Sequence, residues 1–320
     1  MKARHLIQLW AAVAMTGCDT SRDPAELVAP GSGGQLVLDA YLLVNLPIPP
    51  VFVRQTLPPN VPFTLEAAAI RGATVLLDDG TSTFTYAEDP DLPGRYLPER
   101  PDPESPPPLI ERLTRYEIRV ESDGRTMRAW TFTPDQLDIE EAAIVHDETL
   151  EDLRQLRIYD EATPDPCAAR ENAVVYQEGL LEARFAPLDV PSYQVAMFPL
   201  DPNAEAVIDL QFLDLDDEEI QEFFAEARAG SQSPPLEVED GNLRLPWFAI
   251  VFGGPHKMRL FALDENWFDY VRSNGQTNPG YAGGLAGDNF ERPIFHVEGG
   301  IGLLGSASVD SICFNVQPPD

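Results

Sequence analysis

Two stretches of regular apolar and polar alternation, joined by Asp123-Gly124, constrain the fold of this chain more than any other feature of its sequence. Residues 116–121 alternate Tyr, Ile and Val with charged residues, and residues 126–132 form a second stretch of the same kind. A period of two residues predicts a strand with one buried and one exposed face, and Asp-Gly is a strong hairpin signal. We therefore expect an antiparallel pair of strands over residues 116–132.

Most of the remaining chain carries the same signals. Further strands are expected near residues 36–41, 63–67, 73–77, 83–86, 181–185, 208–212, 243–247 and 258–262. The tail, residues 293–316, is expected to be a strand, a glycine-rich passage and a second strand. Three helices are expected. The first is a short helix around Leu150, Leu153, Arg154 and Leu156, which have loosely helical spacing. The second begins within 214–219 and ends before Gly230, and the third covers about 264–273.

The 320 residues are more than one ordinary hydrophobic core usually covers, so two domains are expected. The fold class predicted is mainly β, with two β-sandwich-like domains. The first is expected to be immunoglobulin- or transthyretin-like, and the second a larger β domain with two helical insertions. The expected divisions are a signal peptide (1–17), a tether (18–34), the first domain (35–134), a connector with a short helix (135–166) and the second domain (167–320).

The leader combines Lys2 and Arg4 with a short apolar run over residues 6–15, which is typical of a signal peptide. Its last four residues, Met-Thr-Gly-Cys, resemble the lipobox of bacterial lipoproteins. This resemblance implies cleavage before Cys18 and lipidation of its thiol. Two alternatives stay open: a short transmembrane anchor, and an ordinary cleaved secretory signal in which Cys18 has no role.

The chain is strongly acidic, with 53 Asp and Glu against 22 Lys and Arg and a net charge of −31. Nucleic acid and anionic membrane surfaces are therefore poor partners, because neutralising phosphates takes clustered basic residues. The acidity is explained by solvation of the surface. The alternative is a role in binding or steering cations.

Cysteine use fits an oxidising compartment. With Cys18 assigned to the lipid, Cys167 and Cys313 remain as a pair, and we expect a disulfide between them. The alternative is two unpaired buried thiols.

Motifs for catalysis, cofactors or metals are weak. Residues 300–305 match G-x-G-x-x-G, but the residues after Gly305 predict a strand, so we expect glycines at a bulge or a tight crossing and no nucleotide. The acidic run 214–219 lacks the glycine and distal glutamate of a calcium loop and fits a helix start. His146, His256 and His296 have no zinc-ligand spacing. We predict no cofactor, no metal site and no catalytic residue, although the many carboxylates hide any glycosidase-like pair.

Aromatic residues gather in the second half of the chain, and four of them could stack on a ligand: Trp247, Trp267, Tyr270 and Tyr281. Trp267 and Tyr270 are three residues apart on an expected helix, so packing in the core is the alternative.

Five short segments together resemble a known family. They read GATVLLDDG (72–80), PGRY (93–96), YEIRV (116–120), LDENWFDY (263–270) and VEGGIGLLG (297–305). They resemble the domain-of-unknown-function 4249 family of Gram-negative envelope lipoproteins. The resemblance implies residence in the cell envelope, often beside TonB-dependent outer-membrane receptors, with no established activity and no catalytic residues to carry over. The strong acidity and the proline-rich loop over 99–108 depart from the family.

These observations predict a lipid-anchored protein of the cell envelope, located at the outer membrane. Its expected role is that of a non-catalytic binding or accessory module in uptake or assembly. An edge strand, the proline-rich loop or the aromatics of the second half would supply the contact surface. The alternatives are a carboxylate-dependent glycan hydrolase and a structural spacer.

Overall fold

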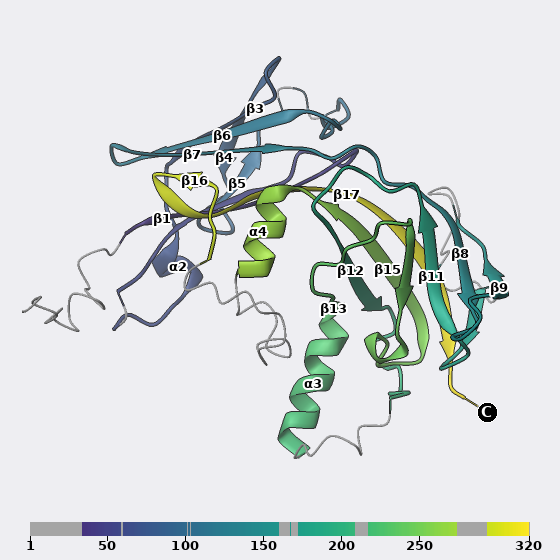
Figure 1. The fold of residues 1–320 in the computed structure, drawn as a ribbon. Coiled ribbons are helices and arrows are strands. Elements are labelled where there is room, and N and C mark those ends of the chain that lie inside the picture. Colours follow the sequence, from purple (N-terminus) through teal and green to yellow (C-terminus); the bar gives the residue numbers. More distant parts are fainter. Residues whose placement is uncertain are drawn as a thin grey trace, which may run out of the picture.

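A computed structural model describes residues 34–58, 60–100, 102, 104–159, 167, 172–208, 217–273 and 293–319. The fold is mainly β, as predicted, and its described strands form one long, strongly bent sheet and a second, four-stranded sheet that covers one end of it (Figure 1). The leader, Cys18, and the tether before Gly34 lie outside the described residues.

The strands of the long sheet come from the whole chain. In the first half they are β1 (Leu36–Leu43), β2 (Val51–Gln55), β3 (Thr74–Asp78), β4 (Thr83–Glu88), β5 (Arg95–Pro98), β6 (Arg115–Ser122) and β7 (Arg125–Phe132). In the second half they are β10 (Ala173–Val175), β12 (Ser192–Pro199), β13 (Ser231–Gln232), β15 (Gly254–Leu263), β16 (Val297–Glu298) and β17 (Gly300–Gln317). Their order is β13-β12-β15-β17-β1-β2-β5-β4-β3-β6-β7-β16, with β10 paired to β17.

The hairpin predicted at Asp123-Gly124 is confirmed. β6 and β7 pair antiparallel from Arg115↔Phe132 to Ser122↔Arg125. Asp123 and Gly124 both have positive φ angles, 49° and 75°, as the two-residue turn requires. The strands predicted at residues 73–77 and 83–86 are confirmed as β3 and β4, which pair as a second hairpin.

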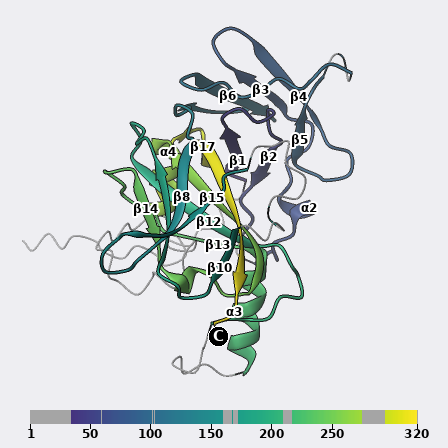
Figure 2. The same cartoon turned by 90° about the vertical axis from the view of Figure 1, so that its right-hand side faces the viewer.

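The second sheet consists of β8 (Ile139–Val145), β9 (Asp152–Leu156), β11 (Leu180–Phe185) and β14 (Asn242–Leu245), in the order β14-β11-β8-β9. Its inner face packs on β12, β15 and β17, and apolar residues of both sheets form one core (Figure 2). The core includes Ile144, Leu181, Val195, Leu260 and Phe314. Two sheets with alternating side chains turned inward are the arrangement of a β-sandwich.

The C-terminal strand β17 ties the two halves of the molecule together. Its first part runs parallel to β1, from Leu36↔Gly300 to Leu43↔Ala307, and its later part pairs antiparallel with β15. Leu304 is therefore buried in the core of the first half and Phe314 in the core of the second. The predicted domain boundaries remain a prediction, but the last strand contributes to both cores.

The two strands predicted in the tail are present as β16 and β17, and the glycine-rich passage from Gly300 onward lies within β17 itself. A Cβ on Gly302 would lie 2.0 Å from the carbonyl oxygen of Leu38, and one on Gly300 would lie 2.8 Å from that of Leu36. The glycines thus allow β17 to approach the backbone of β1 closely, as expected for a tight crossing.

The strand predicted at 63–67 is wrong, because a short helix, α2 (Leu65–Ala68), begins there. Thr64 caps this helix, its hydroxyl accepting a hydrogen bond from the amide of Ala67 at 3.1 Å. Local capping outweighs the β-forming residues Phe63 and Thr64. The strand of this region is β2 instead, which was not predicted.

The helix predicted in the connector is also wrong, because residues 139–156 form the hairpin β8–β9. Leu156 is buried in the sandwich core while Leu153 is 49% exposed, so the leucines do not share one face of a helix. The β-branched residues Ile139, Ile144 and Val145 favour a strand and are buried there.

The other two helices are confirmed as α3 (Asp217–Ala229) and α4 (Glu265–Ser273). Phe223, Phe224 and Ala227 of α3 pack on Phe252, and Gly230 follows the helix with a φ of 110°.

Residues 209–216, which hold most of the strand expected at 208–212 and most of the acidic run, lie outside the described residues. The strand expected at 243–247 ends at Leu245, and Trp247 begins a short 3-10 helix (Trp247–Ala249) after Pro246.

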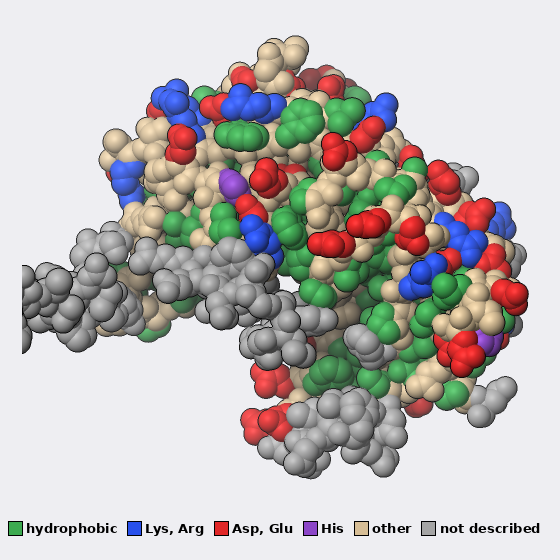
Figure 3. All heavy atoms as spheres, in the orientation of Figure 1, with side chains coloured by type: hydrophobic (Ala, Val, Ile, Leu, Met, Phe, Trp, Pro, Cys, Tyr) green, Lys and Arg blue, Asp and Glu red, His purple; other side chains and the backbone are tan. Residues whose placement is uncertain are grey.

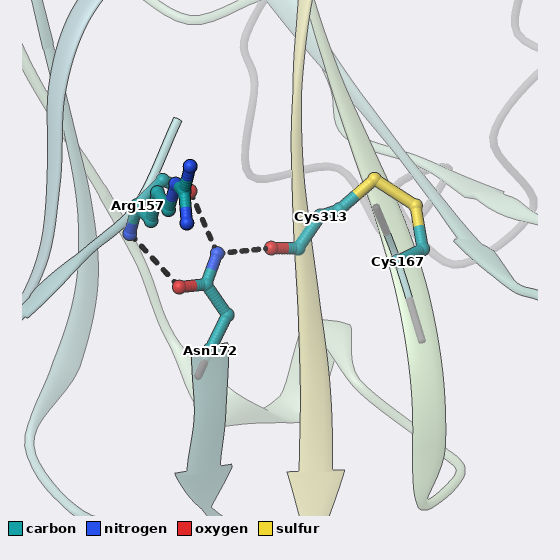
Figure 4. Close-up of a disulfide and its surroundings, with 4 residues drawn as sticks. All are labelled: Arg157, Cys167, Asn172 and Cys313. Carbon is teal, nitrogen blue, oxygen red and sulfur yellow. Dashed lines mark hydrogen bonds between the residues drawn. A yellow bond between two sulfur atoms is a disulfide. The ribbon is translucent and has the colours of Figure 1, made fainter. Parts of the chain in front are cut away.

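Cys167 and Cys313 form the predicted disulfide, which joins residues 146 positions apart in the chain (Figure 4). Beside it, Asn172 donates hydrogen bonds to the carbonyl oxygens of Cys313, at 2.8 Å, and Arg157, at 2.7 Å. Its own amide oxygen accepts from the backbone of Arg157 at 2.8 Å. The half-cystine on β17 is therefore held by both the sulfur bridge and a buried amide.

His256, on β15, is expected to make the protein less stable in mild acid. The ring is 1% exposed, lies 5.7 Å from the ring of Phe314, and its Nδ1 is 2.9 Å from the carbonyl oxygen of Gly254. Burial lowers the pKa of His256 below its ordinary value of 6.5. The unfolded chain then takes up a proton at a higher pH than the folded chain, so stability is lost as the pH falls below 6.5.

The variant His256→Gln keeps a side-chain donor and removes this titration. Urea unfolding of both proteins at several pH values between about 5 and 8 should show a steeper loss of stability for the wild type, by up to about 1.4 kcal/mol per pH unit. Parallel curves for the two proteins would show that His256 does not titrate differently on folding.

Candidate functional site

The outward face of β6, β7 and β16 carries exposed aromatic and arginine side chains together. Residues paired across an antiparallel ladder point to the same side of a sheet, and here the outward pairs are Arg115↔Phe132, Glu117↔Trp130 and Arg119↔Arg128. Trp130 is 55% exposed and Phe132 is 51% exposed. Figure 3 shows basic and hydrophobic side chains side by side along the upper part of the molecule, over these strands.

A pocket of about 420 Å³ opens on this face. β6 and β7 form one wall with Arg115, Glu117, Arg128, Ala129 and Trp130, and the segment 295–298 forms the other with Phe295, His296, Val297 and Glu298. The volume is at the small end of the range for ligand pockets.

The polar lining of the pocket is only partly satisfied within the protein. Arg115 lies 3.2 Å from Glu117, and its guanidinium carbon is 5.2 Å from the centre of the Trp130 ring. Arg128 has no ion-pair partner among the described residues. Its fork of donors is therefore available to a bound molecule.

Helix α4 fixes the strand that carries Trp130. The side-chain amide of Asn266 donates to the backbone oxygens of Trp130, at 2.7 Å, and Leu304, at 2.9 Å. One helix residue thus joins β7, at the residue that carries the exposed indole, to β17.

Next to it, buried Asp264 caps α4, accepting from the amide of Trp267 at 2.9 Å and from the hydroxyl of Thr131. Burial raises the pKa of the Asp264 carboxyl, against the lowering effect of these hydrogen bonds. Because Thr131 points inward, its neighbour Trp130 points outward.

The opposite wall is held by a second charged group on α4. Asp269, whose side chain is only 11% exposed, lies 2.7 Å from Nε2 of His296 and 2.7 Å from Nε of Arg272. A histidine oriented by a carboxylate can act as a base, but such a pair needs a nucleophile to form a triad. The described residues that line the pocket contain no Ser, Thr or Cys.

The four aromatic residues predicted to stack on a ligand do not come together in the described structure. Trp267 is partly buried and packs against a hydrophobic cluster, 4.9 Å from the ring of Tyr41 and 5.9 Å from that of Phe261. Tyr270 lies 6.2 Å from Phe295, behind the pocket wall.

The other two aromatics lie elsewhere. Trp247 is in the second half, 5.5 Å from Tyr176, and donates to the carbonyl oxygen of Gly179. Tyr281 lies outside the described residues. For Trp267, the alternative of core packing is the one that the structure supports.

No three His, Cys, Asp or Glu side chains of the described residues are placed to hold a metal ion. In the same part of the chain, none of the helices has the length and apolar character needed to cross a bilayer. Comparison with protein-family models and with curated proteins finds no match to this chain. The resemblance to the 4249 family therefore remains a prediction.

Proposed function

We propose that this chain is a lipid-anchored binding module of the cell envelope, held through Cys18, whose pocket between β7 and residues 295–298 takes up a glycan. The observation that carries the proposal is Trp130, an indole that is exposed over a pocket and whose backbone carbonyl is held by Asn266. An aromatic side chain exposed to water on a fixed backbone costs free energy, and such side chains are characteristic of binding sites. The leader and the family resemblance support the location and a role beside an outer-membrane receptor.

The composition of the pocket favours a sugar ring as the ligand. The flat face of Trp130 offers an apolar, electron-rich surface to ring C–H groups. Around it, Arg128, His296 and Glu298 offer donors and acceptors for hydroxyl groups. A mixture of one aromatic platform and several polar groups fixes a ligand's orientation as well as its affinity.

The hydrolase alternative fits this pocket less well. Its two glutamates lie on β6 and β16, with β7 between them, and strands two positions apart are about 10 Å apart. A retaining pair of carboxyl groups is about 5–5.5 Å apart and an inverting pair about 6.5–9.5 Å apart, and the general acid of either is normally shielded from water. Glu117, with a side chain 42% exposed, is not shielded.

Trp130→Ala is expected to weaken glycan binding by about tenfold or more, since an aromatic anchor typically contributes about 2 kcal/mol or more. The measurement is titration against a panel of oligosaccharides released from peptidoglycan and lipopolysaccharide. Leu113→Ala is the matched control, because Leu113 is also 55% exposed but does not line the pocket. Equal affinities for the wild type and Trp130→Ala, or no binding by the wild type to any member of the panel, would contradict the proposal.

A further inference from the structure

The segment Asn60–Ala67, which we call the Phe63 loop, is exposed at every residue although it is rich in apolar side chains. Val61 is 39%, Phe63 68% and Leu65 46% exposed, and Phe63 is the most exposed large hydrophobic residue of the described chain. Single exposed apolar residues are ordinary, but three within five residues form a patch that calls for a partner.

The Phe63 loop is held in a defined conformation. Ala68, at its end, is fully buried, and the amide of Ile70 donates to the carbonyl oxygen of Val53 at 3.1 Å. Thr64 caps α2, and the amide of Val61 donates to the carbonyl oxygen of Pro58 at 2.9 Å. The loop therefore presents Phe63 to its surroundings on a fixed support.

The Phe63 loop leaves the sheet beside the point where the chain arrives from Cys18. The amide of Gly34, the first described residue, donates to the carbonyl oxygen of Thr56 at 3.0 Å, and that of Gln35 donates to the Thr56 hydroxyl at 3.1 Å. Sixteen residues lie between Cys18 and Gln35, and they span at most roughly 50 Å. A lipid on Cys18 thus keeps this end of the molecule within reach of the bilayer.

The charge of this region differs from that of the rest of the chain. Between Asp39 and Asp78 the only acidic residue is Glu66, and the two basic residues are Arg54 and Arg71, whereas the whole chain has 53 acidic residues. Glu66 is itself paired with Arg71 at 2.6 Å. Glu88, from β4, also lies beside Arg71 at 3.7 Å, and Asp39 lies beside Arg54 at the same distance. The acidic side chains that contact this region therefore face arginines, which weakens their repulsion of a membrane surface.

We propose that the Phe63 loop docks into the interfacial region of the bilayer that holds the lipid anchor, with Phe63 inserted among the lipids. This inference depends on the proposed attachment through Cys18. An anchor combined with a second contact gives firmer attachment than either alone and also fixes the orientation of the protein. Figure 1 shows α2 on the lower side of the first half and β6 and β7 on its upper side, so docking through α2 leaves the strand pair that carries Trp130 on the opposite side.

The test uses the chain from Cys18 to Asp320, coupled through the Cys18 thiol to a maleimide lipid in phosphatidylcholine vesicles. Phe63→Trp introduces a fluorescent reporter. Replacing the lipid by one with brominated acyl chains is expected to quench the added fluorescence roughly twofold, because the indole lies at the acyl boundary. Leu113→Trp is the matched control, and its added fluorescence should not change, since Leu113 is exposed but lies outside the Phe63 loop.

The chemical anchor separates this inference from the attachment proposed for Cys18. If the added fluorescence of Phe63→Trp is not quenched in the coupled protein, docking is overturned, whatever the cell attaches to Cys18. If sedimentation shows a dimer that is lost in Phe63→Ser, the loop binds a second copy of the chain, and docking is again overturned. Quenching confined to Phe63→Trp supports docking even if acylation in cells is not found.

Discussion

Gly302→Ala is expected to destabilise the protein by more than about 4 kcal/mol, which is exceptional for a single substitution. Gly302 has a φ of 111°, a conformation that an alanine adopts only under strain. Its new Cβ would lie 2.0 Å from the oxygen and 2.8 Å from the nitrogen of Leu38. Both are backbone atoms of β1, so the contact is relieved only by separating β1 from β17, the pair that links the two cores.

Gly124→Ala is the matched control for this prediction. Gly124 also has a positive φ, 75°, but a Cβ there would meet no atom within 4 Å. Only the backbone strain remains, and it costs about 1–2 kcal/mol. Urea unfolding followed by circular dichroism compares the two variants; similar losses of stability would mean that the close approach of β17 to β1 is not needed for folding.

The parts of the fold that could be predicted from the sequence are those determined by neighbouring residues. The β6–β7 hairpin follows from a period of two and a two-residue turn, and α4 from helical spacing. The errors at Phe63 and in the connector arose where a short segment fits two patterns and its packing partners decide between them. Pairing of β17 with β1 joins residues more than 250 positions apart, and no local signal specifies it.

The same distinction holds for the site. The exposure of Trp130 could have been predicted from the sequence. With a two-residue turn at Asp123-Gly124, the buried residues at even positions of β6 pair with residues at odd positions of β7. The odd positions of β7 are therefore buried too, and Trp130, at an even position, is exposed. The opposite wall could not have been identified, because His296 reaches the pocket through the pairing of Val297 with Ala129 and the contact with Asp269. Sequence reasoning instead favoured Trp267 as a ligand-stacking residue, but its place on α4 packs it, partly buried, against a hydrophobic cluster.

Cys18→Ser is expected to move the protein almost completely from the membrane fraction to the soluble fraction and to abolish its labelling by fatty acid. One acyl chain gives marginal attachment and two or more give stable attachment, so loss of the acylated residue removes nearly all of the membrane affinity. The Phe63 loop alone presents only a few apolar side chains and is not expected to retain the protein. Met15→Leu, which brings the leader closer to the common lipobox, is the control and should be labelled like the wild type.

Comparing the wild type with Cys18→Ser also separates the three interpretations of the leader. A short transmembrane anchor predicts that both proteins stay in the membrane without label, although an apolar run of ten residues spans only about 15 Å of a core about 30 Å thick. An ordinary secretory signal predicts that both are soluble. Only lipidation predicts a labelled, membrane-bound wild type and an unlabelled, soluble variant. That result would place the folded body outside the cytoplasm, where the disulfide between Cys167 and Cys313 is chemically stable and a glycan of the envelope is within reach of the pocket.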